Sequence, residues 1–473
     1  MNTNIPTAVL SSIAFFAGCA VVPADAPPDP AVARSENTAQ VERTFEQNRR
    51  QYGTNANYLV RPGLLADRAR KQVRLNAESA KLNAADPVEF PLIAQNSGKD
   101  YEALAVAFAK PSDVHDALVF IGLTPGCPVD PGAFRFWPKG ERVRMTFVYR
   151  DATNTLRTAT VEHFILDSRT GKTLPDEGFA FTGSTRVPAP GTEGTATVYA
   201  ADVYSPNAIA VVYNDSTAVL DVPRRVSQNE VYSYQVPNPA LPLLPHQLLE
   251  VVIEPKDANA PNRVHEYVLQ VRPSPSTPGD AALELTDSSG TVISTNRTAR
   301  GLASALDRLV AEGQDPYVTV VPGDALPLSA LGGVCGSLDS LENGGKMRVE
   351  PPPKGHPYYK AFLPNEKFRS RKERTIQPME LRLGEGTASP TGTLTFIEEK
   401  WNPETDVSVY TETNCPVASP KELADLLGRK NAPSVLLVFA SADLTYGALR
   451  TSIEPALDRR LILYVFLPPP QKP

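Results

Sequence analysis

Histidine and cysteine are scarce in this chain of 473 residues. The five histidines and four cysteines are scattered, and no CxxC or HxxxH spacing brings any two of them together. A structural zinc site takes four such ligands, usually as closely spaced pairs. The sequence therefore predicts neither a metal site nor a cofactor.

Basic residues are also fewer than acidic residues in this chain. The chain carries 47 lysines and arginines against 53 acidic residues, which gives a net charge of −6 and a pI near 5.6. Nucleic-acid binding requires clustered Lys and Arg, so this composition argues against a nucleic-acid partner. The basic run KFRSRKER at 367–374 is interpreted as an exposed linker, with contact to an anionic wall polymer or lipid as the alternative.

Glycine is less frequent than proline, with 29 glycines and 46 prolines. Helix interiors tolerate proline poorly, so the chain should be rich in strands, turns and loops. An apolar content of 41% and the chain length give room for about three domains with hydrophobic cores.

An apolar stretch near the N-terminus indicates export. IPTAVLSSIAFFAGCAVV, residues 5–22, precedes the proline-rich PADAPPDPA. Its segment FAGC resembles a bacterial lipobox, which implies lipid attachment to Cys19, although no lysine or arginine precedes the stretch. Cleavage after Ala26, an uncleaved anchor and a chance apolar stretch are the alternatives. All but the last place the rest of the chain in the periplasm or cell envelope, and lipidation anchors it to a membrane that faces the periplasm.

The region from 58 to 270 alternates short strands with a helix. In RARKQVRLNAES, Val73, Leu75 and Ala77 share one side, which is the period of a half-buried strand. In KPSDVHDALVFIGL, Ser112 is expected to cap a helix whose apolar face includes Val114, and Gly122 ends it. One helix among many strands indicates an α+β domain.

Several ordered motifs in this region carry a family resemblance. DPVEFPLIAQNSGKDYEALAVAFAKPSDVHDALVFIGLTPGCPV is followed by FWPKGERVRMTFVY, FILDSRTGKTLP, FAFTGS and DVYSPNAIAVVYNDSTAVLDVP. Together they resemble the YdjY-domain family of exported bacterial proteins over residues 58–225. The resemblance implies an envelope domain without an established reaction, so it assigns no catalytic residue.

Two later stretches repeat one arrangement. YVTVVPGDALPLSALGGVCGSL at 317–338 and SVLLVFASADLTYGALRTSIEPAL at 434–457 each place an aspartate, Asp324 or Asp443, between an apolar strand and a helix. The surrounding succession of strands and helices resembles the periplasmic domain of the ExbD/TolR family at 281–352 and, less fully, at 379–468. The repetition predicts a duplicated unit in which each copy closes its own sheet. The family's membrane motor role is not expected here, because no acid-bearing membrane stretch directly precedes either copy.

The expected fold class is α+β: a strand-rich YdjY-like domain followed by two small α/β sandwich-like ExbD/TolR-like modules. The expected segments are an export signal at 1–19, a linker with a polar helix at 20–57, the YdjY-like domain at 58–270, the first module at 281–352, a linker at 353–378 and the second module at 379–473.

Five ionisable residues are candidate binding or acid positions. Glu89 and Glu102 lie on adjacent expected strands and could form the paired carboxylates of a glycosidase, with surface or turn roles as the alternative. His115 could be an acid-base residue, with a solvated first-turn histidine as the alternative. Asp324 and Asp443 could be functional acids, and the alternative is that each caps the following helix.

The remaining cysteines and tryptophans favour structural roles. Lipidation of Cys19 leaves Cys127, Cys335 and Cys415, whose connectivity cannot be deduced from spacing, and we expect them to be mostly buried small hydrophobes. Trp137 and Trp401 are interpreted as buried anchors, with ligand platforms as the alternative.

The function that the sequence favours is that of a noncatalytic envelope protein. No GxSxG elbow is present, and no serine has recognisable His and Asp partners. We therefore expect a binding or assembly module whose partners are envelope proteins or a cell-wall polymer. The alternative is a wall or carbohydrate hydrolase that uses carboxylates of the YdjY-like domain.

Overall fold

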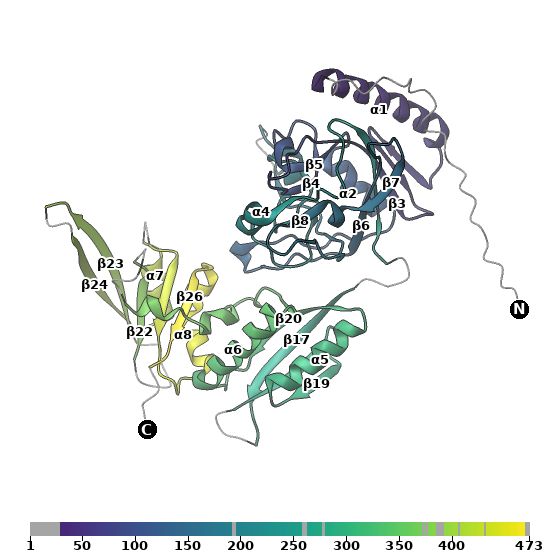
Figure 1. Cartoon of the computed structure of the whole chain (residues 1–473). Helices are drawn as coiled ribbons and strands as arrows, with labels where there is room; N and C mark the ends of the chain where they lie inside the picture. The colour runs from purple at the N-terminus through teal and green to yellow at the C-terminus, as the bar shows by residue number, and fades with distance from the viewer. Residues whose placement is uncertain are drawn as a thin grey trace, which may run out of the picture.

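The computed structural model describes residues 29–191, 195–257, 263–276, 280–370, 374, 377–384, 392–404, 407–429 and 432–468. Within them the chain is a mixed α+β protein that is rich in strands. A barrel comes first, and two further mixed sheets with helices follow (Figure 1). The apolar stretch at 5–22, with Cys19, lies outside the described residues. No described helix is both long enough and apolar enough to cross a bilayer.

The first region contains a closed barrel of eight strands. Closure follows from β3, which pairs with β16 along one edge and with β5 along the other. The order around the barrel is β3-β16-β6-β10-β14-β13-β4-β5, while β1 and β2 extend from β3 and β7 pairs with β6. These strands are β1 (Tyr58–Arg61), β2 (Leu64–Asp67), β3 (Gln72–Ser79), β4 (Phe90–Ala94), β5 (Ala103–Ala107), β6 (Arg142–Arg150), β7 (Leu156–Thr160), β10 (Phe179–Phe181), β13 (Ala208–Ala210), β14 (Leu220–Asp221) and β16 (Leu248–Pro255).

Two small sheets accompany the barrel. One pairs β15 (Gln235–Pro237) with β8 (Ile165–Asp167) and β9 (Lys172–Thr173), and the other pairs β11 (Arg186–Pro188) with β12 (Thr197–Tyr199). The helices of this region are α1 (Pro30–Tyr52), α2 (Pro111–Phe120), α3 (Ala200–Val203) and α4 (Gln228–Tyr234).

Alternation along the strands fills the barrel with apolar side chains. On β3, Val73, Leu75 and Ala77 are buried while Arg74 and Asn76 are half-buried, which confirms the predicted period of two. The same alternation runs along β6, where every second residue is buried. In β3 and β6 the sequence pattern therefore indicates which face of the strand points inward.

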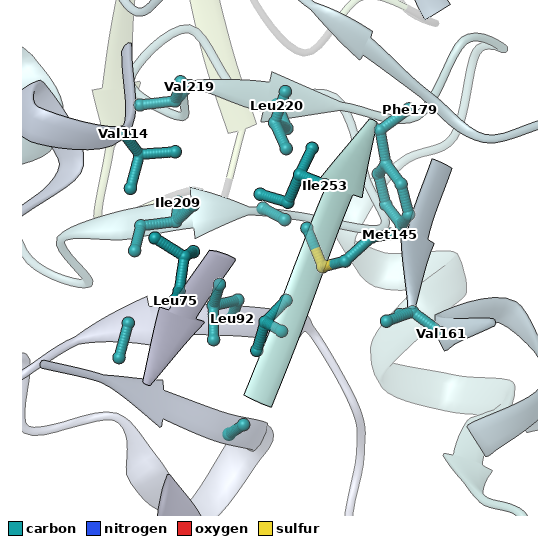
Figure 2. Packing of buried hydrophobic residues seen from close by; sticks show 14 of the residues in the cluster. Leu75, Leu92, Val114, Met145, Val161, Phe179, Ile209, Val219, Leu220 and Ile253 are labelled. Atoms are coloured by element: carbon teal, nitrogen blue, oxygen red, sulfur yellow. The ribbon is translucent and has the colours of Figure 1, made fainter. Parts of the chain in front are cut away.

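The barrel core joins strands that are far apart in sequence. Figure 2 shows Leu75 of β3, Leu92 of β4, Met145 of β6, Phe179 of β10 and Ile253 of β16 within one packed cluster. All five are buried. Burying an apolar side chain of this size stabilises the fold by about 1.5–3 kcal/mol.

Helix α2 packs its predicted apolar face on this core, but its cap differs from the expectation. Val114 is buried and belongs to the cluster of Figure 2. The helix begins at Pro111, and no side chain caps it, so Ser112 is not a cap. Proline is favoured at this first position because its missing N–H would have no partner inside the helix. The backbone N–H of Ser112 donates instead to Asp202 Oδ1 at 3.0 Å.

The rest of the chain forms two five-stranded sheets with one shared order. The first sheet runs β19-β18-β17-β20-β21 and the second runs β24-β23-β22-β25-β26, and in both the chain passes through three strands, a helix, a strand, a helix and a strand. The first unit comprises β17 (Val264–Pro273), β18 (Ala281–Asp287), β19 (Val292–Asn296), α5 (Ala299–Ala311), β20 (Asp315–Pro322), α6 (Leu328–Asn343) and β21 (Arg348–Val349). The second comprises β22 (Met379–Leu383), β23 (Gly392–Asn402), β24 (Val407–Val417), α7 (Pro420–Leu427), β25 (Val435–Phe439), α8 (Tyr446–Asp458) and β26 (Ile462–Phe466).

The central strand of the first sheet starts earlier than the sequence division placed it. Strand β17 pairs with β18 on one side and with β20 on the other, so the sheet begins at 264 rather than at 281. The division assigned most of β17 to the preceding domain. Central position in a sheet depends on pairing with strands that come later, and this is invisible in local periodicity.

One hydrophobic core serves both sheets and the segment between them. Val320 and Leu331 of the first unit belong to the same buried cluster as Val438 and Leu449 of the second. Buried side chains of the connecting segment complete it: Tyr358, Tyr359, Ala361 and Phe362. The described part of 353–378 is thus more than a linker. Each unit has its own sheet, as predicted, while the buried core is shared between the two units.

The basic run in that segment is only partly exposed. Lys367 and Arg369 are exposed, as expected for a linker. Arg374 is buried and forms an ion pair of 2.8 Å with buried Glu380. Phe368 packs on the second sheet, so the part of this stretch around it contacts the sheet.

Candidate functional site

The structure brings Glu89 and Glu102 together but buries both carboxylates. Glu89 directly precedes β4, and its N–H donates to the carbonyl of Glu102 at 3.0 Å. Gln228 Nε2 donates to Glu89 Oε2 at 3.1 Å, and Lys99 lies 3.4 Å from Glu102 Oε2. Burial raises the pKa of Glu89, and the neighbouring charge of Glu102 adds to this, while the Gln228 bond opposes it. The pair is a satisfied buried cluster rather than two acids that flank an open cleft.

His115 is also more buried than a solvated first-turn residue would be. Its ring lies between Tyr199 and Phe181, with centroid distances of 4.4 and 5.3 Å. Nδ1 lies 3.1 Å from the Tyr199 hydroxyl and 3.3 Å from Asp116 Oδ1. Burial lowers the pKa of His115, although Asp116 opposes the shift. Among the described residues, His115 shares no hydrogen bond or ion pair with the other candidates.

The turns that hold the two predicted aspartates face each other across the junction of the two sheets. They exchange backbone bonds in a reciprocal pattern: Leu328 N to Leu444 O (2.9 Å), Ser329 N to Ala442 O (3.1 Å), Tyr446 N to Leu326 O (2.8 Å) and Gly447 N to Asp324 O (2.9 Å). The first N–H groups of a helix have no partner inside it. Each turn therefore satisfies the helix start of the other unit, α6 or α8.

This geometry overturns the capping interpretation of both aspartates. Helix α6 follows Pro327 with no side-chain cap, and α8 is capped by Thr445. The Asp324 carboxylate instead pairs with Arg450 on α8, at 3.1 Å to each oxygen. Asp443 is exposed and caps neither helix. The reciprocal bonds align Asp324 with Ala442, so the two aspartates are not equivalent positions.

Beside this pair, the connecting segment contributes a histidine. His356 Nδ1 lies 2.8 Å from the hydroxyl of buried Tyr446, the first residue of α8. Burial lowers the pKa of His356, and nearby Arg450 lowers it further while Asp324 opposes this. Together with the Asp324–Arg450 ion pair, this contact fixes the segment, α8 and the β20 turn to one another.

Two buried acids join the barrel to the first sheet. Glu342 on α6 accepts from Trp137 Nε1 at 2.7 Å and from the Tyr359 hydroxyl at 2.5 Å. Asp315 on β20 pairs with Arg142 of β6 at 2.8 Å and with Arg348 of β21 at 3.2 Å. Burial alone would raise the pKa of Asp315, but the two guanidinium groups outweigh burial and hold it below its ordinary value. Trp137 is therefore the buried anchor that the sequence favoured.

Trp401 is not a buried anchor, which corrects the expectation. Only residues 392–395 of β23 pair with β22, and β23 and β24 continue together beyond that point. We call this continuation, residues 396–402 and 407–413, the arm. It projects away from the rest of the second sheet (Figure 1), and Trp401 on it is 59% exposed.

The cysteines divide by burial. Cys335 on α6 is fully buried, as expected, and burial raises the pKa of its thiol. Cys127 and Cys415 are half-buried, and all three are free thiols. In the described part of the chain, no group of three or more His, Cys, Asp or Glu residues is placed to hold a metal ion.

The first region is thus a closed, strand-rich barrel of the α+β class that is accompanied by helices α1 to α4. Residues 64–211 match the family model of the YdjY domain, so this part of the chain is a YdjY domain. Strands β14 and β16 lie beyond the matched residues and still belong to the barrel. No curated protein matches the chain, and the comparisons give no support to the ExbD/TolR resemblance expected for the two later units.

Sequence reasoning missed the residues that join the parts. Arg450, His356 and Glu342 act through partners more than 15 residues away, and no local pattern marks such pairs. One signal was available: the aromatic run FRFWP at 134–138 is unusual for a loop. In the structure Phe134 stacks on Tyr358 with centroids 5.7 Å apart.

Proposed function

We propose that this chain is a noncatalytic binding or assembly protein of the bacterial cell envelope. In this proposal Cys19 carries a lipid anchor, and the two C-terminal units are duplicated ExbD/TolR-like modules that contact envelope proteins or a wall polymer. The barrel holds the modules at a fixed orientation. The projecting arm supplies the contact surface.

The observation that supports this proposal is the exposure of the arm. A two-stranded ribbon is at best marginally stable in water when it lacks further strands or a covering helix. The arm nevertheless exposes Trp401 and, on its other face, Val409, which is 52% exposed. Exposed tryptophan is enriched at binding sites, where it supplies much of the contact energy.

The hydrolase alternative finds less support in the positions of its acids. A glycosidase needs one carboxylate to protonate the leaving group and another facing the sugar or a water molecule. Glu89 and Glu102 are buried and bonded to Gln228 and Lys99. Release of sugar ends from cell-wall substrate that disappears in a folded Glu89→Gln variant would favour the hydrolase instead.

Site-specific photo-crosslinking in the native host tests the proposal. A benzoylphenylalanine at 401 should form a discrete adduct in intact cells, whereas the same group at Tyr232 on α4 should not. The two positions form a matched pair, because both side chains are 59% exposed. Equal adducts at both positions, or none at 401, would contradict a specific arm contact.

Removal of the arm gives a second readout. Joining Phe396 to Thr413 through Asn-Gly keeps their cross-strand register and supplies a favoured two-residue hairpin turn. This variant should fold and should no longer recover, in a pull-down from chemically crosslinked envelopes, the partner that the full chain recovers. Anchoring is tested separately: a clickable fatty acid should label the wild type, and equal labelling of Cys19→Ser would reject lipidation at Cys19.

A further inference from the structure

A cleft separates the barrel from the first sheet and is distinct from the arm. Its volume is about 760 Å³, which is within the range of small-ligand pockets. One wall is formed by the barrel loops at 124–126 and 139–141. The other wall is formed by the start of β17, the β18–β19 turn and the C-terminal end of α5.

The two walls are held at a fixed separation. Lys139 on the barrel side forms ion pairs with Glu266 of β17 and, at 3.0 Å, with Glu350 after β21. The hydroxyl of buried Tyr317 donates to the Pro138 carbonyl at 2.7 Å. Gly140 lies so close to the backbone of Phe181 that an added Cβ would come within 2.2 Å of its carbonyl oxygen. The loop that carries Lys139 is thus locked on both sides, and the cleft is preformed.

The cleft is lined by more carboxylates than lysines and arginines. Lys139 is neutralised by its two glutamates, and Arg308 lies 4.0 Å from Glu312. Two further carboxylates line the cleft, Glu141 and Asp287, and among the described residues neither forms an ion pair with a cation. Asp287 holds its own turn through bonds from Ser289 and Thr291, so its charge is fixed in place.

Glu141 is the carboxylate with the least compensation. Burial raises its pKa, while a backbone bond from Thr124 and the more distant charge of Lys71 oppose the rise. Apolar side chains lie along the same cleft: Pro125, Ile293 and Leu309. The lining therefore offers a partly desolvated carboxylate next to an apolar surface.

We propose that this cleft binds a small amine-bearing ligand of about dipeptide size. Its ammonium group pairs with Glu141, Asp287 on the other wall adds a second negative charge to the cleft, and its apolar part packs on Ile293 and Leu309. A charge-assisted hydrogen bond in a partly buried site is about twice as strong as a neutral one, which makes Glu141 the selective contact. The proposal does not depend on the arm or on the envelope function.

Two matched peptides test it on the full chain. We expect acetyl-Lys-Leu-amide to bind in calorimetric or saturation-transfer NMR titrations. Acetyl-norleucyl-Leu-amide has a similar length but lacks the ammonium group, and it should bind at least about tenfold more weakly. Equal affinity for the two peptides, or no binding of either at 10 mM, overturns the proposal.

Protein variants locate the site. Glu141→Gln should weaken the lysine peptide by about tenfold and leave the norleucine peptide unchanged. Ser288→Lys adds a competing cation at an exposed position of the cleft and should also weaken the lysine peptide, which keeps the test decisive if Glu141→Gln does not fold. Glu254→Gln, in a separate groove on the barrel, should bind like the wild type. Wild-type affinity in both cleft variants overturns the proposal.

Discussion

At the scale of single residues, Asp221 is an acid that is completely removed from water. It is fully buried on β14 and accepts from Asn214 Nδ2 and the Asp215 N–H, each at 3.2 Å. No described cation pairs with it. Burial raises its pKa well above the ordinary value, with the Asn214 bond opposing.

The raised pKa of Asp221 determines whether the free energy of unfolding rises or falls with pH. An unfolded aspartate loses its proton near pH 4, while folded Asp221 keeps it to higher pH. The folded state therefore binds more protons in that interval, and the free energy of unfolding falls as pH rises, by at most about 1.4 kcal/mol per pH unit. Asp221→Asn should flatten the stability curve between pH 4.5 and 8 in urea titrations. Parallel curves for the two proteins would show that Asp221 is ionised in the fold.

Asp315 has the opposite environment, because it is buried among arginines. Asp315→Asn would leave Arg142 and Arg348 as uncompensated charges in the interface and should cost about 3–5 kcal/mol of unfolding free energy. Asp307→Asn is the control, since Asp307 pairs with Lys346 at the surface and such pairs contribute about 0–1 kcal/mol. Chemical denaturation of both variants measures the difference, and equal costs would mean that the buried cluster is not coupled to folding.

At the scale of elements, the two units approach each other closely at the start of α8. A Cβ on Gly447 would lie 2.7 Å from Asp324 Cβ, so Gly447→Ala should push the turn away and cost about 1–3 kcal/mol. Gly333→Ala is the matched control, because open space surrounds that helical position and alanine is the better helix former by about 1 kcal/mol. A stabilising Gly447→Ala in thermal unfolding would show that the turns can separate without loss.

Elements were predictable from sequence where one period dominates, and their partners were not. The alternation of β3 and the apolar face of α2 were both read correctly from local spacing. The expected cap at Asp324 was wrong because a carbonyl of the other unit lies where a side-chain cap would act. The sheet position of β17 was missed for a similar reason, since its neighbours β18 and β20 follow it in sequence. The local sequence determines whether a segment is a helix or a strand, and pairing with distant segments determines its caps and its position in a sheet.

At the scale of the whole molecule, the shared core makes the two C-terminal units interdependent. Val320→Asp places an unpaired charge in that core, which costs several kcal/mol out of a typical stability of 5–15 kcal/mol. Hydrogen exchange should then show loss of protection in β25 of the second unit as well as in β20. Val310→Asp, at a position that is 41% exposed on α5, should leave both strands protected. Loss confined to β20 would contradict a single cooperative core.

The sequence predicted individual strands of the barrel but not that these strands close into a ring. Strand-like segments were evident from 58 onward, yet the ring closes only because β16, more than 160 residues after β3, inserts between β3 and β6. The sequence places Glu89 and Glu102 on adjacent strands but does not show that both are buried. That burial, and the presence of the cleft lined by Glu141, arise from packing between distant segments.

The reciprocal bonds between the two turns have a consequence for how this chain can change. The contact is isologous within a single polypeptide, since each unit offers the same patch, a helix start and a pair of carbonyls, to the other. Two separate copies of one ancestral unit could form the same contact around a twofold axis. In the joined chain, a shift of either turn removes hydrogen bonds from the first N–H groups of the other unit's helix. A substitution that moves one turn therefore requires a compensating substitution in the other unit.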